Sequence, residues 1–280
     1  MCRQALFGTL MGMFVLVAAP PGATRADNGP TYSSTATKEI VTKMVDAHGG
    51  IKKWRACPTV CFDSHLKVDF GGGNWVEFWE EVTVDPETRR VYADLPNPDG
   101  TKGMLAFDGT HAWSAGNLQG IGKAPARFTA WRNFYLFNIP WLTQDAGVIL
   151  GEPGKSKIPN DSKVYLTIPM SFASGSGDTP RDTYVLYIDP DTYQLKASEY
   201  GMTYKSMMPE GVEETPRSVF VWDATAQVDG FLVLTQYNVY WKQDGSTAVV
   251  GEVSNWSFQR PFDDSRMNMP SDGSVDESQP

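Results

Sequence analysis

The chain has 280 residues and a formal net charge of -9 at pH 7, and 12% of its residues are aromatic, including 9 tryptophans. Such an acidic protein is poorly suited to bind the negatively charged backbone of nucleic acid, so no nucleic-acid partner is expected. The length suits one β-sandwich or β-barrel domain, and the aromatic content indicates a large core or an apolar pocket.

The N-terminus has the features of an export signal. Arg3 is followed by an apolar run over residues 5–19, and a Pro-Pro-Gly sequence then breaks the run before it is long enough to cross a bilayer comfortably. We therefore predict a cleaved signal peptide over residues 1–26, a flexible lead-in over residues 27–33 and a periplasmic location. An uncleaved membrane anchor is the alternative. No later apolar run reaches the length of a membrane span.

An amphipathic helix is predicted next, over residues 34–48. Apolar residues recur at helical spacing from Ile40 to Val45, and Gly49 with the glycine after it ends the helix. His48 lies at this helix end, where an imidazole can cap carbonyl groups, so we assign it a structural role.

Two cysteines, Cys57 and Cys61, remain in the mature chain. Thiols tend to pair in an oxidising compartment, so we expect a local disulfide, with a turn at Pro58 that brings the two Cα atoms close enough. A redox or copper-binding pair is the alternative. It is disfavoured because the thioredoxin-like two-residue spacing is missing and only His65 lies nearby.

The hydrophobic period then changes from helical spacing to alternation, which predicts strands. Short alternating runs are separated by turns rich in Gly, Pro, Asn and Asp, which is typical of an antiparallel meander. The predicted strands cover residues 61–70, 75–84, 89–94, 103–107, 111–114, 148–150, 162–172, 184–188, 194–200, 218–223, 231–241 and 248–258.

One segment interrupts the meander. A helix is predicted from Pro125 to Ile139, with aromatic residues at helical spacing, and Pro140 is expected to end it. Both sides of this helix carry bulky apolar residues, so it must be buried all round, and a single flat sheet covers only one side. We therefore predict a mainly β fold in which one large curved antiparallel sheet, an incomplete β-barrel, encloses the apolar helix.

The enclosed helix has two interpretations. It fills the barrel as dry core, as aromatic stripes usually do, or it borders a cleft in which an acyl chain or another apolar ligand lies. Under the second interpretation two tryptophans from strands form the opposite wall. The predicted ligand-binding residues are Phe128, Trp131, Phe134, Tyr135, Phe137, Trp141, Trp79 and Trp113.

No catalytic or metal-binding pattern emerges from the sequence. There is no Gly-x-Ser-x-Gly elbow, no His-Glu-x-x-His helix and no complete calcium loop. We expect no enzyme activity, no metal and no cofactor. An envelope hydrolase is the less favoured alternative, and it would require His48 or His111 to meet a carboxylate in a cleft.

Four short segments carry a family resemblance: residues 47–50 with Trp54, and residues 107–113, 131–135 and 187–192. Together they resemble the segments of an uncharacterised exported family near the LolA/LolB-like lipoprotein-carrier superfamily. The resemblance implies an incomplete β-barrel with a helical lid and a hydrophobic cavity that handles lipids or lipoproteins, or senses them, at the envelope, without catalysis.

The sequence thus predicts one LolA-like half-barrel domain over residues 34–261 and a disordered acidic tail over residues 262–280. The predicted function is a non-catalytic periplasmic binding protein, expected to be a monomer, whose partner is an apolar ligand or a lipidated protein. The alternative is a structural or interaction protein with a dry core.

Overall fold

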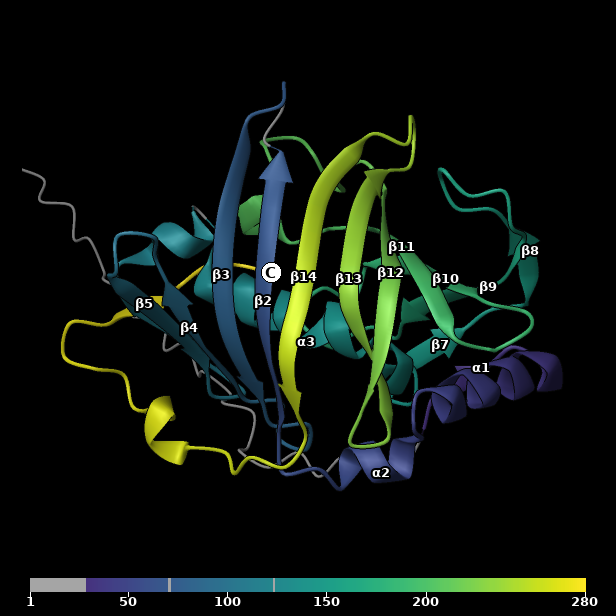
Figure 1. The fold of residues 1–280 in the computed structure, drawn as a ribbon, viewed down its shortest axis with the longest axis horizontal. Coiled ribbons are helices and arrows are strands. Elements are labelled where there is room, and N and C mark those ends of the chain that lie inside the picture. Colours follow the sequence, from purple (N-terminus) through teal and green to yellow (C-terminus); the bar gives the residue numbers. More distant parts are fainter. Residues whose placement is uncertain (1–28, 70–71, 123) are drawn as a thin grey trace, which may run out of the picture.

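The computed structural model describes residues 29–69, 72–122 and 124–280; the predicted signal peptide lies outside them. The fold is mainly β. One large sheet, which is not closed into a barrel, curves around the long helix α3 (Ala126–Leu142), as Figure 1 shows. The predicted fold class, a mainly β incomplete barrel around an apolar helix, is confirmed.

The sheet joins two meanders, because β14 pairs with β2 and so connects the second half of the chain to the first. All pairs in the sheet are antiparallel except β1 with β7, so the sheet is mixed. In spatial order the strands are β1 (Thr31–Tyr32), β7 (Val148–Leu150), β9 (Tyr165–Phe172), β10 (Thr183–Ile188), β11 (Leu195–Gly201), β12 (Ser218–Val228), β13 (Phe231–Trp241), β14 (Thr247–Ser257), β2 (Val60–Asp69), β3 (Trp75–Val84), β4 (Val91–Pro96), β5 (Lys102–Phe107), β6 (Ala112–Gly116) and β15 (Ser274–Asp276), with β8 (Gly154–Ser156) paired to β9 off this path.

Both edges of the sheet are covered by segments that were predicted to lack structure. β1 lies in the predicted flexible lead-in, and β15 lies in the predicted disordered tail, which also contains the 3-10 helix η3 (Asp264–Met267). The prediction of a disordered tail is therefore wrong. Edge strands present unpaired backbone groups, and these two short strands satisfy those of β7 and β6.

Helices α1 (Thr35–Ala47) and α2 (Ile51–Arg55) lie together at one end of the sheet (Figure 1). Ser34 caps α1, since its side chain accepts a 3.3 Å hydrogen bond from a backbone N–H in the first turn. At the other end Gly49 has φ +99°, and a Cβ there would lie 2.6 Å from the carbonyl oxygen of Gly230. The Gly-Gly pair thus permits both the turn and the close approach of the β12–β13 hairpin.

Helix α3 begins after Pro125, as predicted, but it continues through Pro140 to Leu142, so the prediction that Pro140 ends it is wrong. The proline removes one backbone hydrogen bond. The helix nevertheless completes its last turn, because Trp141 is fully buried and stacks on Trp54 with 5.7 Å between ring centroids. The packing of Trp141 in the core outweighs the tendency of Pro140 to end the helix.

The predicted disulfide is also wrong, because Cys57 and Cys61 are both free thiols. Pro58 lies in a bend, but the two thiols do not pair. Instead, Cys57 Sγ donates to the carbonyl oxygen of Lys53 at 3.4 Å, and the buried Cys61 Sγ lies 3.3 Å from the hydroxyl of Thr59. Each thiol is thus held by its own local partner.

Two further 3-10 helices lie in connections: η1 (Leu118–Ile121) between β6 and α3, and η2 (Lys205–Met207) between β11 and β12. Within the described ranges, no helix is both long and apolar enough to span a bilayer.

Candidate functional site

Helix α3 presents two different faces. One stripe is fully packed in the core and includes Ala130 and Trp141. The other stripe is half-buried and consists of Phe128, Trp131, Arg132, Tyr135 and Leu136. Their spacing of three and four residues places them along one side of the helix. The prediction that the helix is buried all round is therefore correct only for the first stripe.

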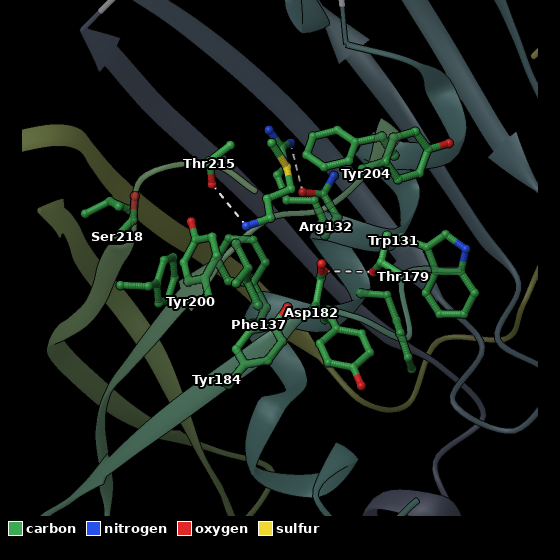
Figure 2. Close-up of a pocket in the computed structure, with 18 of the residues that line it drawn as sticks. Trp131, Arg132, Phe137, Thr179, Asp182, Tyr184, Tyr200, Tyr204, Thr215 and Ser218 are labelled. Carbon is green, nitrogen blue, oxygen red and sulfur yellow. Dashed lines mark hydrogen bonds between the residues drawn. The ribbon is translucent and has the colours of Figure 1, made fainter. Parts of the chain in front are cut away.

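A cavity of about 940 Å³ lies between the half-buried stripe and the sheet. This volume is at the upper end of the range found for pockets that bind small molecules. Figure 2 shows labelled side chains from α3, from β10 and β11, and from the loop before β10 gathered around it.

The opposite wall comes from the inward-facing rows of several strands. Leu66 and Val68 of β2 contribute, as do Phe220 of β12 and Tyr237 of β13. Tyr237 pairs across the strands with Gly251, where a Cβ would lie only 2.1 Å from the ring. The glycine therefore leaves room for the tyrosine ring to lie over β14, and the wall is lined mainly by apolar and aromatic surface.

Two ion pairs have both members in this lining, Arg89 with Asp145 and Arg132 with Glu80. Arg132 of α3 donates through Nη2 to Glu80 Oε1 on β3 and to the Oδ1 atom of Asn133, which is 3.0 Å away. Burial opposes the charge on Arg132, but the attraction of Glu80 outweighs it, so the pKa of the guanidinium is raised. The arginine therefore remains charged inside the cavity.

Tyrosine rings from four elements also line the cavity. They are Tyr135 of α3, Tyr184 of β10, Tyr200 of β11 and Tyr237 of β13. Burial raises the pKa of all four, in the case of Tyr200 to about 12. Each hydroxyl consequently keeps its proton at neutral pH and is available as a hydrogen-bond donor.

A loop between β9 and β10 borders the cavity at the N-terminal end of α3. Asp178 of this loop forms an ion pair with Arg127 of α3. Asp182 accepts hydrogen bonds from Thr179 at 2.8 Å and from the hydroxyl of Thr203 at 2.6 Å. Burial raises the pKa of Asp182 despite these bonds. The loop is thus fastened to both α3 and the end of β11.

Five of the eight predicted ligand-binding residues line the cavity: Phe128, Trp131, Phe134, Tyr135 and Phe137. The other three lie elsewhere. Trp141 belongs to the packed core, and Trp79 lies on the opposite face of β3, stacked on His65 with 4.8 Å between centroids. Trp113 packs against the C-terminal tail, where its Nε1 donates to the carbonyl oxygen of Met267 at 3.3 Å.

The sequence interpretation missed the charged pair and most of the second meander's contribution. The missed lining residues include Glu80, Arg132, Phe172, Tyr184, Tyr200, Phe220 and Tyr237. Strand alternation contained part of this signal, because it shows which residues share a face, although it does not show which face turns inward.

All three histidines lie outside the cavity lining. His48 is buried in the core, as its predicted structural role requires, and His65 Nε2 lies 3.0 Å from Oε2 of Glu77 on the sheet's other face. His111 is largely exposed, 3.8 Å from Asp108. The convergence that an envelope hydrolase would require, with His48 or His111 beside a carboxylate in this cavity, does not occur in the described part of the chain.

No protein-family model and no curated protein matches the sequence. Solved structures do match the fold. A DUF1329 family protein from Desulfovibrio piger aligns over 83% of this chain and 96% of its own, with a TM-score of 0.52 and 13% identity. A putative outer membrane lipoprotein-sorting protein domain from Vibrio parahaemolyticus aligns over 81% and 97%, with a TM-score of 0.50 and 10% identity.

A LolA superfamily protein from Nitrosomonas europaea also aligns, over 82% of this chain and 96% of its own, with a TM-score of 0.49 and 8% identity. At these identities the likeness concerns the fold. The predicted resemblance to a lipoprotein-carrier-like fold and to a domain of unknown function is confirmed at the level of the fold, by the DUF1329 and lipoprotein-sorting structures.

Proposed function

We propose that this protein is a non-catalytic periplasmic binding protein that holds an apolar ligand, such as a lipid or the acyl chain of a lipoprotein, between α3 and the sheet. The observation that carries the proposal is the cavity of about 940 Å³ with rings of α3 along one wall. A dry core, which a purely structural protein would need, leaves no space of this size.

Three further features support the proposal. The Vibrio parahaemolyticus domain with the same fold is described as a putative outer membrane lipoprotein-sorting protein, which fits a lipid-like ligand. The predicted signal peptide fits a periplasmic location. The three histidines and two free cysteines, which would be the first candidates for acid-base or nucleophilic chemistry, lie outside the lining.

The proposal is tested by filling the cavity. Leu136 lies on the half-buried stripe of α3, so Leu136→Trp adds a ring to the cavity lining. The variant is expected to bind an apolar fluorescent dye at least about tenfold more weakly than the wild type, because the dye loses its space. Ile149→Trp is the matched control, since Ile149 lies on β7 outside the lining and is 38% exposed.

The control variant should bind the dye as the wild type does, and both variants should melt cooperatively. Equal dye binding by wild type, Leu136→Trp and Ile149→Trp would contradict the proposal, because the dye would then be bound elsewhere.

A further inference from the structure

The two members of the ion pair are not equally accessible. The Glu80 side chain is 1% exposed, whereas the Arg132 side chain is 26% exposed and lines the cavity. The carboxylate therefore lies behind the guanidinium, and a molecule in the cavity meets the cation first. An accessible charge in an otherwise apolar pocket favours one orientation of a bound ligand, with the polar end of the ligand at the charge.

Some hydrogen-bond donors of the Arg132 guanidinium have no acceptor in the described part of the chain. Both bonds to Glu80 and Asn133 use Nη2, and within the described part of the chain Nε and Nη1 donate to no protein atom. The Nδ2 atom of Asn133, on a fully buried side chain that also lines the cavity, has no partner there either. Buried polar groups are rarely left unpaired, so the Asn133 Nδ2 atom indicates a polar partner that is not part of the described chain. Nε and Nη1 of the partly exposed Arg132 side chain are accessible to the same partner.

Tyr200, which also lines the cavity, supplies a further hydroxyl. Burial raises its pKa to about 12, and the positive charge of Arg132 partly offsets the rise. The phenol is therefore protonated at neutral pH and can donate a hydrogen bond into the cavity.

The remaining charged residues of the lining have partners of their own. Asp178 is paired with Arg127, and Asp145 with Arg89 at 2.6 Å. Asp182 accepts from Thr203, and Asp69 accepts a 3.3 Å hydrogen bond from a backbone N–H of the following turn. These carboxylates do not compete for Arg132. Arg89 is a second cation of the lining, but its partner Asp145 lines the cavity beside it, whereas the Glu80 partner of Arg132 is 1% exposed.

The geometry points to an amphiphile with an anionic head as the ligand class: a carboxylate or phosphate oxygen accepts from the free side of Arg132 and from Asn133, and an alkyl chain lies along the aromatic wall. This inference rests on the proposed function and specifies it. An uncharged acyl chain would leave the same donors unpaired, whereas two oxygens of one head group suit the fork of a guanidinium.

The test compares three probes with the same chain: dodecanoate, dodecyl phosphate and dodecanol, each titrated calorimetrically into the full mature protein. The wild type is expected to bind dodecanoate or dodecyl phosphate at least about tenfold more tightly than dodecanol, since a charge-assisted hydrogen bond is lost with the alcohol. The ratio between carboxylate and phosphate tells which head group the site prefers.

Two variants assign the effect to this site. Glu80→Gln removes the negative charge behind Arg132, so it should tighten dodecanoate binding and leave dodecanol unchanged. Glu80→Gln/Arg132→Gln removes both charges without stranding either, and it should bind all three probes with similar affinity. Its retained dodecanol binding shows that the variant is folded.

Equal affinity of the wild type for all three probes would overturn the anionic-head inference while leaving the apolar cavity in place. Preference for the anions that persists in the double variant would also overturn it, because the selectivity would then come from another cation. Failure of every probe to bind the wild type would contradict the proposed function itself.

Discussion

The Nε2 atom of His48 accepts a 3.0 Å hydrogen bond from the backbone N–H of Leu195, although 147 residues separate the two in sequence. Since Nε2 accepts, the proton of the neutral ring lies on Nδ1, which donates to the carbonyl oxygen of Leu232 at 3.0 Å. One buried imidazole at the end of α1 thus satisfies backbone groups of β11 and β13 and fixes the helix to the sheet.

This arrangement predicts a pH-dependent stability. Burial lowers the pKa of His48 to about 4 in the folded protein, whereas the unfolded chain retains the ordinary value of 6.5. Between these values the unfolded state binds more protons, so stability is fully present above about pH 6.5 and falls as the pH drops toward 4. The loss over this window is about 3 kcal/mol in the free energy of unfolding.

Urea denaturation at pH 7 and at pH 4.5 measures the effect. Carboxylates titrate in part of the same window, so the informative quantity is the difference between wild type and His48→Gln. The variant should be less stable at pH 7 and should lose less stability on acidification. Identical pH dependence of the two proteins would contradict the assigned role of His48.

The stacked pair Trp54 and Trp141 predicts a stability effect without a binding effect. Trp141→Ala empties a fully buried site between α3 and α2 and should cost about 3 to 5 kcal/mol in the free energy of unfolding. Trp79→Ala removes the same kind of ring from the half-buried stack on His65 and should cost less than half as much. Similar losses for both variants in urea denaturation would contradict the assignment of Trp141 to the core.

The C-terminal tail is predicted to stabilise the N-terminal end of α3. Asp276 Oδ2 accepts a 2.7 Å hydrogen bond from the backbone N–H of Arg127 in the first turn of the helix. Asp276→Asn should lower the free energy of unfolding by about 1 kcal/mol, because a carboxylate stabilises a helix N-terminus more than an amide does. Asp272→Asn is the matched control on the exposed part of the same tail, and it should melt like the wild type.

The buried ion pair predicts a non-additive mutant cycle. Arg132→Ala leaves the carboxylate of Glu80, whose side chain is 1% exposed, buried without its cation, and should cost about 3 to 5 kcal/mol in the free energy of unfolding. The double variant Glu80→Gln/Arg132→Gln leaves no buried charge without a partner. Its free energy of unfolding should fall by less than half as much as that of Arg132→Ala. A double variant as unstable as Arg132→Ala would show that the stranded charge is not the cause.

The spacing of apolar residues in the sequence was enough to predict most strands, the long helix and part of the site. Alternation placed Leu66 and Val68 on the apolar row of one strand, and helical spacing placed Trp131 and Tyr135 on one helix. These predictions succeeded because the period of each element decides which of its residues share a face. The two edge strands could not be found in this way, because their pairing depends on contacts between segments far apart in the chain.

The charged pair illustrates a signal that was present and not used. Glu80 is the single charge in the inward row of its strand, next to Phe78 and Val82, and Arg132 lies on the half-buried stripe of an apolar helix. Charges of opposite sign on two buried faces predict a partnership, since neither is tolerated alone. Trp79 and Trp113 were wrongly placed in the cleft because aromatic character alone does not tell which face of a strand turns inward.

The central claim is that the space beside α3 holds a lipid-like molecule. Native mass spectrometry of the mature protein, purified gently from the cells that produce it, tests this claim most directly. The account predicts a complex heavier than the polypeptide by the mass of one acyl-chain-containing molecule, which is released on activation and is absent from the Leu136→Trp variant. A bare polypeptide, or the same adduct on Leu136→Trp, would contradict it.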